Sequence, residues 1–363
     1  MNPQNELPIL RLPFRAMEEV SKALHSIINM ISNRRSNTFP ILRLPFLAIE
    51  EIFKAMHPIE IINFSMISKR AKAVTTNMTF YSKYAIGLGI GETMAIAIKG
   101  TNDLVSCIYL MTSNEKMDGM VEEYENNGFI QRKVYKYSKD PVEEWKQVCK
   151  YVLDIFKRQT IDVLGVALDV FVDQNVSIID FLKTNVKSVN GCNLDQWEEE
   201  NDVDEHAAYL LENIKINNEL RSDLDTKNVD FDMKIPKNLK ELHIKKADWI
   251  GYDKLLEIDS AQVSFGTNRI SNKELNSFFK KWMAMETHLN LELLAFEFKS
   301  LEDLRLFVLH DIPHEVVDEA VKRTLITDRD ETEEISGGVD IRRIDGRTAT
   351  FFVQYDGFSM SVH

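Results

Sequence analysis

The sequence predicts an α+β fold in which a small all-helical unit precedes a larger region of alternating strands and helices with β-rich ends. Three observations predict it. Apolar residues recur at helical spacing just after Pro45. Short runs of strand-forming residues alternate with helical stripes from about residue 160 onward. Near the C-terminus, two strand-like runs flank Asp345 and Gly346, a dipeptide typical of a two-residue hairpin turn.

The helical unit is predicted to span residues 39–76. Pro40 and Pro45 each restrict the residue before them, so the segment starts extended and then turns into helix. His57 and Pro58 end this first helix, and proline is well suited to start the next one. Two short helices expose too much apolar surface to be stable alone. The unit therefore needs a partner surface, in the same chain or in another one.

Residues 1–38 hold a shortened copy of this unit and a polar linker. Leu7–Val20 matches Phe39–Ile52, but four residues are missing from the second helix of the copy. Their loss rotates the apolar face of that helix by more than a full turn. We interpret the copy as a decayed duplicate that does not dock. A second docking site, a flexible N-terminal arm and a gene-prediction artefact are the alternatives.

Residues 80–363 are predicted to form the second region. From about residue 160, strands and helices alternate at intervals of roughly 20–30 residues, as in leucine-rich-repeat units. Leu239–Ile244 and Leu291–Phe296 fit the strand part of that repeat. We predict an irregular leucine-rich-repeat-like α/β solenoid with strands on a concave face and helices outside. An ordinary mixed α/β domain of βα units is the alternative.

The elements of this region follow from apolar spacing. The predicted strands are 84–91, 93–99, 104–110, 163–168, 186–194, 239–244, 261–265, 291–298, 339–344, 348–353 and 358–362. The predicted helices are 141–158, 176–182, 207–214, 252–256 and 272–282. Residues 328–338 are acidic and contain glycine, so we predict a loop there.

Composition excludes several classes of function. The hydrophobic content of 44% and charged content of 28% are ordinary for a folded chain of 363 residues. No window approaches an unbroken apolar run of about 18 residues, and the N-terminus lacks a signal pattern. We therefore expect no membrane partner and an intracellular location, cytoplasmic or nuclear or both. The net charge of −13 argues against a nucleic-acid partner, which would require a basic face.

No motif predicts catalysis, a cofactor or a metal. Gly87–Gly91 has the glycines of a phosphate loop, but the third comes one residue early and a strand-like run follows, so we predict a hairpin turn. His310 and His314 could face one another on a helix, but Pro313 would break it. The three cysteines are scattered and odd in number, which predicts reduced thiols and neither a disulfide framework nor a metal site.

The sequence resembles a known family in two places. The Leu-Pro start at Leu44, the helical runs around His57 and Pro58 and the Ser-Lys-Arg exit at 68–70 together resemble an F-box. Leucine stands at position 47, where the widespread F-box pattern has an acidic residue. Further along, six segments are similar to the type 2 F-box-associated domain of the large nematode F-box families: Leu239–Ile244, Trp249–Ile250, Leu255–Leu256, Asn272–Asn276, Phe278–Trp282 and Arg343–Thr350.

The resemblance implies a non-catalytic substrate-recognition subunit of a Skp–cullin–F-box ubiquitin ligase. Residues 39–76 would be the F-box that docks the Skp-type adaptor and, through it, a cullin. Residues 80–363 would hold an unknown target protein, which we expect on the strand-bearing face and the 198–204 loop. By match to the motif, the adaptor contacts would be Leu44, Pro45, Ile49, Ile52, Ile61 and Phe64.

Two other functions remain open on the sequence. A stand-alone leucine-rich-repeat-like interaction module that has lost adaptor docking is the first. An enzyme that uses the Gly87–Gly91 loop is the second, and it would require nucleotide binding.

Overall fold

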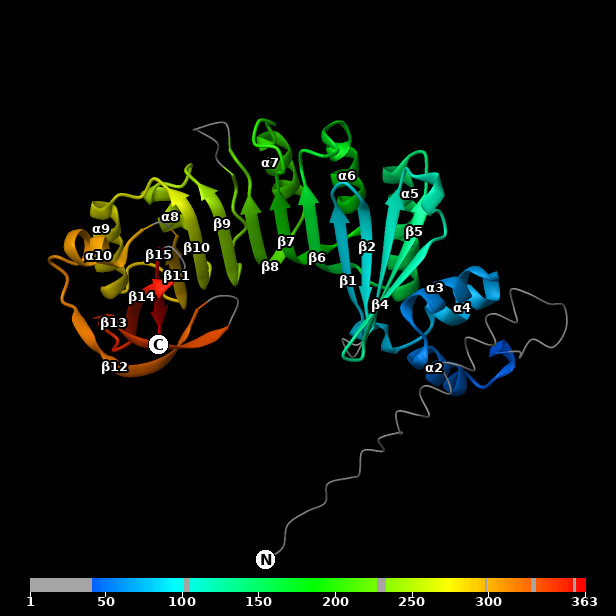
Figure 1. Ribbon diagram of the computed structural model, residues 1–363, viewed down its shortest axis with the longest axis horizontal. Helices are drawn as coiled ribbons and strands as arrows, with labels where there is room; N and C mark the ends of the chain where they lie inside the picture. The colour runs from blue at the N-terminus through cyan, green and yellow to red at the C-terminus, as the bar shows by residue number, and fades with distance from the viewer. Residues whose placement is uncertain (1–40, 101–104, 227–232, 298, 328–330, 355–356) are drawn as a thin grey trace, which may run out of the picture.

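The computed structural model describes residues 41–100, 105–226, 233–297, 299–327, 331–354 and 357–363. Their fold is mixed α/β: helices near the N-terminus precede a 15-stranded sheet with strand order β12-β13-β14-β15-β11-β10-β9-β8-β7-β6-β1-β2-β3-β5-β4 (Figure 1). The shortened copy at 1–38 lies outside the described residues. Among the described helices, none is long and apolar enough to cross a membrane.

The helical unit begins with a short 3₁₀ turn and continues through three helices. These are η1 (Ile41–Arg43), α2 (Phe46–Ala55), α3 (Pro58–Met66) and α4 (Lys69–Thr76). The imidazole of His57 accepts a hydrogen bond from the amide of Ile59, and the carboxylate of Glu60 accepts one from the amide of His57. This reciprocal cap fixes the start of α3. The two predicted helices are confirmed, and α4 adds a third.

A five-stranded section of the sheet adjoins the helical unit, which is drawn in blue in Figure 1. After the 3₁₀ turn η2 (Phe80–Lys83), it consists of β1 (Ala85–Ile90), β2 (Met94–Lys99), β3 (Val105–Thr112), β4 (Val121–Asn126) and β5 (Phe129–Tyr137). Strands β1 and β2 pair antiparallel around Gly91, so the hairpin predicted for the glycine motif is confirmed. Strands β4 and β5 were not predicted from the sequence.

The middle of the sheet is a run of parallel strands in chain order. Helix α5 (Pro141–Phe156) precedes it. Each crossover is expected to be right-handed, so helices that join successive neighbours come to one face. The run comprises β6 (Thr160–Ala167), α6 (Asn175–Asn185), β7 (Ser188–Asp195), α7 (Asp204–Asn213), β8 (Ile216–Asp223), β9 (Glu241–Ala247), α8 (Tyr252–Glu257), β10 (Gln262–Asn268), α9 (Asn272–Met283) and β11 (Leu293–Phe296).

The C-terminal section is antiparallel. Helix α10 (Leu301–Asp303) and a π turn, η5 (Leu304–Val308), lead into β12 (Glu315–Ile326), β13 (Thr332–Arg342), β14 (Thr348–Gln354) and β15 (Gly357–Val362). The loop predicted for 328–338 is wrong from Thr332 onward, because these residues belong to β13 and pair with β12. Strand β12 bulges in this pairing, because residues 318–321 lie opposite Gly337 alone, and Gly337 and Gly338 on β13 have positive φ angles there.

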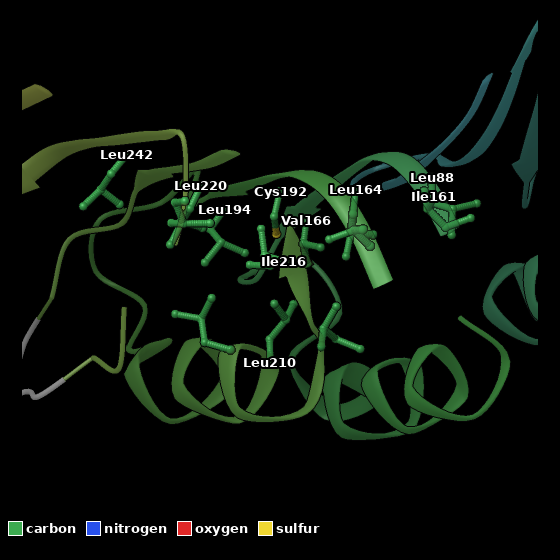
Figure 2. Close-up of a cluster of buried hydrophobic side chains, with 14 of the residues drawn as sticks. Leu88, Ile161, Leu164, Val166, Cys192, Leu194, Leu210, Ile216, Leu220 and Leu242 are labelled. Carbon is green, nitrogen blue, oxygen red and sulfur yellow. The ribbon is translucent and has the colours of Figure 1, made fainter. Parts of the chain in front are cut away.

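The core is a row of apolar side chains that runs across the sheet. Its members pair directly from strand to strand and are at most 1% exposed: Leu164, Cys192, Leu220, Leu242, Val263 and Leu294. Figure 2 shows several of them between the sheet and the helices, with Leu210 of α7 approaching from the helix side. The adjacent Val163 points the other way and is 47% exposed. The parallel middle of the sheet therefore has one face covered by helices and one open face.

The three cysteines are free and buried. Burial raises the pKa of the thiols of Cys107, Cys149 and Cys192 to about 12, so they are protonated at neutral pH. They act as small apolar side chains in the core.

Candidate functional site

The six residues predicted to contact an adaptor divide into two groups. Three lie at or near the surface of the helical unit: Leu44, Pro45 and Ile52. The other three are at most 8% exposed: Ile49, Ile61 and Phe64. In this structure the buried three support the helices from inside, and the rings of Phe53 and Phe64 meet edge to face at 5.2 Å. Their role as direct contacts stays a prediction.

The structure instead exposes four apolar residues that the sequence analysis did not select. They are Phe46 (44%), Leu47 (72%), Met66 (59%) and Ile67 (59%), which we call the apolar patch. The guanidinium of Arg70 donates a hydrogen bond to the carbonyl of Leu42 at 3.0 Å. This contact places the junction of α3 and α4 beside the segment that leads into α2. Large apolar side chains left in water at such a junction indicate a contact surface for another protein.

The helical unit is fixed to the sheet and to α5 by polar contacts. The hydroxyls of Ser65 and Tyr151 lie 2.8 Å apart, and the ammonium of Lys72 lies 4.6 Å from the centre of the Tyr151 ring. The guanidinium of Arg132 on β5 reaches Glu60 of α3 at 3.5 Å. The helical unit and the sheet are therefore held in one orientation.

His57 is buried beneath this junction. Burial, with the nearby positive charge of Arg132 as a second cause, lowers the pKa of His57 to about 4. The imidazole is therefore neutral at physiological pH. A neutral imidazole can cap α3 without a buried charge beside the Arg132 guanidinium.

We expect Tyr151→Ala to destabilise the helical unit by about 1–2 kcal/mol. The change removes the hydroxyl that meets Ser65 and the ring beneath Lys72. Urea unfolding of the full chain measures the loss. Lys183→Ala, on an exposed position of α6, is the control and should leave the midpoint unchanged. An unchanged midpoint for Tyr151→Ala would show that this contact does not hold the unit to α5.

The open face of the sheet is a second candidate surface and is polar. Glu219, Arg221 and Glu241 carry an ion-pair network across β8 and β9. The ammonium of Lys245 pairs with Asp223 at 2.7 Å. At the end of β7, the indole of Trp197 is 52% exposed. Charged and aromatic side chains of this kind can recognise a protein, and they lie where the sequence analysis expected the target.

The side chains considered as metal ligands have other partners. The Nδ1 atoms of His310 and His314 lie within hydrogen-bond distance of the carbonyls of Phe307 and Ile312. Among the described residues, no group of three or more His, Cys, Asp or Glu side chains could hold a metal ion.

A helical unit with an exposed apolar patch, fixed to a large sheet with an open polar face, is the arrangement of a protein-interaction protein. The family model of the F-box domain matches residues 41–83, and the family model described as F-box associated matches residues 230–296. The chain therefore carries an F-box domain at 41–83 and an F-box-associated domain at 230–296. This pair of domains is typical of a substrate-recognition adaptor of a ubiquitin ligase. No curated protein and no solved structure matches the chain.

Proposed function

We propose that this protein is the substrate-recognition subunit of a Skp–cullin–F-box ubiquitin ligase. The observation that carries the proposal is the match of the F-box domain to a helical unit that leaves its apolar patch in solvent. A short amphipathic helical unit gains stability when it buries such residues in a groove of another protein. The partner at this surface is a Skp-type adaptor, which brings a cullin with it.

The sheet region, which contains the F-box-associated match, holds the target protein. Its open face carries the ion pairs of β8 and β9. The parallel run from β6 to β11 offers this face to the target as a leucine-rich-repeat-like surface, as expected for a nematode-type F-box protein with an F-box-associated domain. The domain boundaries remain those set from the sequence: 1–38, 39–76 and 80–363. The chain itself carries out no covalent step. It raises the effective concentration of target lysines near the conjugating enzyme, inside the cell in the cytoplasm or nucleus.

Binding of the purified Skp-type adaptor to the full chain tests the proposal. We expect Leu47→Glu and Ile67→Glu each to weaken binding at least about tenfold, because each places a charge at the centre of an apolar contact. Leu44→Ala/Pro45→Ala should also weaken it. The matched control is Val316→Glu on β12, which is 55% exposed and far along the sheet, and it should bind normally.

The same assay tests the shortened copy. Leu12→Ala/Pro13→Ala should bind as the unaltered chain does if that copy is a decayed duplicate. A folded chain that does not bind the adaptor at all would overturn the ligase proposal. It would leave the second candidate, a stand-alone interaction module, which the polar open face alone supports.

A further inference from the structure

A cleft of about 870 Å³ opens where the F-box meets the sheet. One wall is the end of the F-box, with Met78, Thr79 and Tyr81. The facing wall is the C-terminal half of α5 and the residues that follow it, 150–160. The starts of the β-strands complete it, since Lys187 directly precedes β7. A molecule bound in this cleft would touch both parts of the protein.

The cleft is positively charged in a protein whose net charge is −13. Its lining includes Lys150, Lys157, Arg158 and Lys187, against one carboxylate, that of Asp154. The guanidinium of Arg158 is paired with Asp162 at 2.9 Å. In the described parts of the chain, the three lysines have no carboxylate within ion-pair distance. Their charges are therefore available to a ligand.

The wall beneath these charges is apolar. Leu153, Phe156 and Tyr81 are at most 5% exposed, and the rings of Tyr81 and Phe156 meet at 4.8 Å. Within the described residues the hydroxyl of Tyr81 has no hydrogen-bond partner, so this wall also contains one unused donor. A fitting ligand carries several negative charges around an apolar group.

The helix dipole does not explain the whole arrangement. Lys157 and Lys187 lie just beyond the C-terminal ends of α5 and α6, where cations stabilise a helix. Lys150, however, lies more than a turn inside α5. Neither the volume of the cleft nor the unused hydroxyl of Tyr81 follows from a dipole.

We propose that this cleft binds an acidic peptide segment of a partner protein, whose carboxylate or phosphorylated side chains face the lysines while an apolar side chain meets the Leu153–Phe156 wall. The volume of the cleft is larger than one anion requires, and its charges come from separate elements, so an extended ligand fits it better than a single ion. The proposal deepens the proposed function by giving the target an acidic segment. Only the statement that the bound partner is the ligase target rests on the proposed function.

Fluorescence anisotropy with a fluorescein-labelled glutamate-rich peptide that contains a central leucine tests the cleft, using the full chain at low salt. We expect the peptide to bind, and Lys157→Glu/Lys187→Glu to weaken binding at least about tenfold. The matched control, Lys273→Glu/Lys322→Glu, makes the same charge change at exposed lysines on α9 and β12, away from both the cleft and the open face. It should alter the affinity by less than about twofold.

The same assay with other ligands distinguishes which kind of molecule binds in the cleft. A peptide with phosphoserine in place of glutamate distinguishes phosphate from carboxylate ligands, and binding of either that depends on the cleft lysines supports the proposal. No peptide binding, or equal loss in both lysine variants, would overturn it. So would cleft-dependent binding of phosphatidylserine vesicles without peptide binding. Adaptor binding by Lys157→Glu/Lys187→Glu should be normal, so failure of the cleft and failure of the ligase proposal are measured separately.

Discussion

Leu164→Ala is expected to lower the free energy of unfolding by about 2–5 kcal/mol, whereas Val163→Ala should change it by less than about 0.5 kcal/mol. The two residues are neighbours on β6, yet Leu164 is fully buried and Val163 is 47% exposed. Leu164 pairs with Leu88 on one side and Cys192 on the other, so its truncation leaves a cavity in the middle of the apolar row. Val163 faces solvent and leaves none.

Urea unfolding of the two variants beside the unaltered chain measures this difference. The two positions are adjacent on one strand, so effects of the local sequence largely cancel and the difference reports burial. A similar loss for both variants would mean that the second face of the sheet is also covered. The open face could then not be the surface that holds a target.

The sequence predicted the elements whose apolar residues follow a clear period. Helix α5 has apolar residues at helical spacing, and its buried side includes Trp145, Cys149 and Val152. Strand β7 likewise has apolar residues that meet those of its neighbours in the core row. In such elements one face is buried by the rest of the chain, so apolar residues recur in the sequence with the period of the helix or strand.

The strands that the sequence analysis missed lack such a periodic pattern of apolar residues. All six residues of β4 are exposed, and β5 is half-buried along nearly its whole length, so neither alternates clearly. Strand β12 at the other edge is also mostly exposed. These strands are held by backbone hydrogen bonds to a neighbour that is already in place, and residue type says little about such pairing. Strand β8 was missed for a different reason: its buried side chains are Ile216, Leu220 and the polar Ser222, so its few apolar residues show no clear period.

The candidate site shows a related limit. The helical stripes that contain Ile49 on α2 and Ile61 on α3 correctly marked faces that need a partner, but a stripe does not say which partner. In the structure, those faces pack within the chain, and Tyr151 and Arg132 secure the unit from outside. The exposed residues of the apolar patch follow only from the three-dimensional arrangement of α2 and α3.

Stability is expected to fall as the pH drops from about 6.5 to about 4, by about 3 kcal/mol for each of two histidines. Burial lowers the pKa of both His57 and His288 to about 4 in the folded chain, against the ordinary histidine value of 6.5. Between these pH values the unfolded chain binds protons that the folded chain excludes. The contribution is therefore fully present above about pH 6.5 and is lost progressively below it.

Urea unfolding at about pH 7 and about pH 4.5 measures this dependence, and His57→Asn and His288→Asn are the variants that test its cause. Asparagine keeps an acceptor at the start of α3 in place of the His57 imidazole. At position 288 asparagine suits the positive φ angle of 47°. Each variant should flatten the pH dependence. His310→Asn, at an exposed imidazole, should leave the pH dependence as it was.

A pH dependence of stability that is unchanged in His57→Asn would place the proton-sensitive group elsewhere. The His57 imidazole within the F-box would then not link the fold of the docking unit to pH.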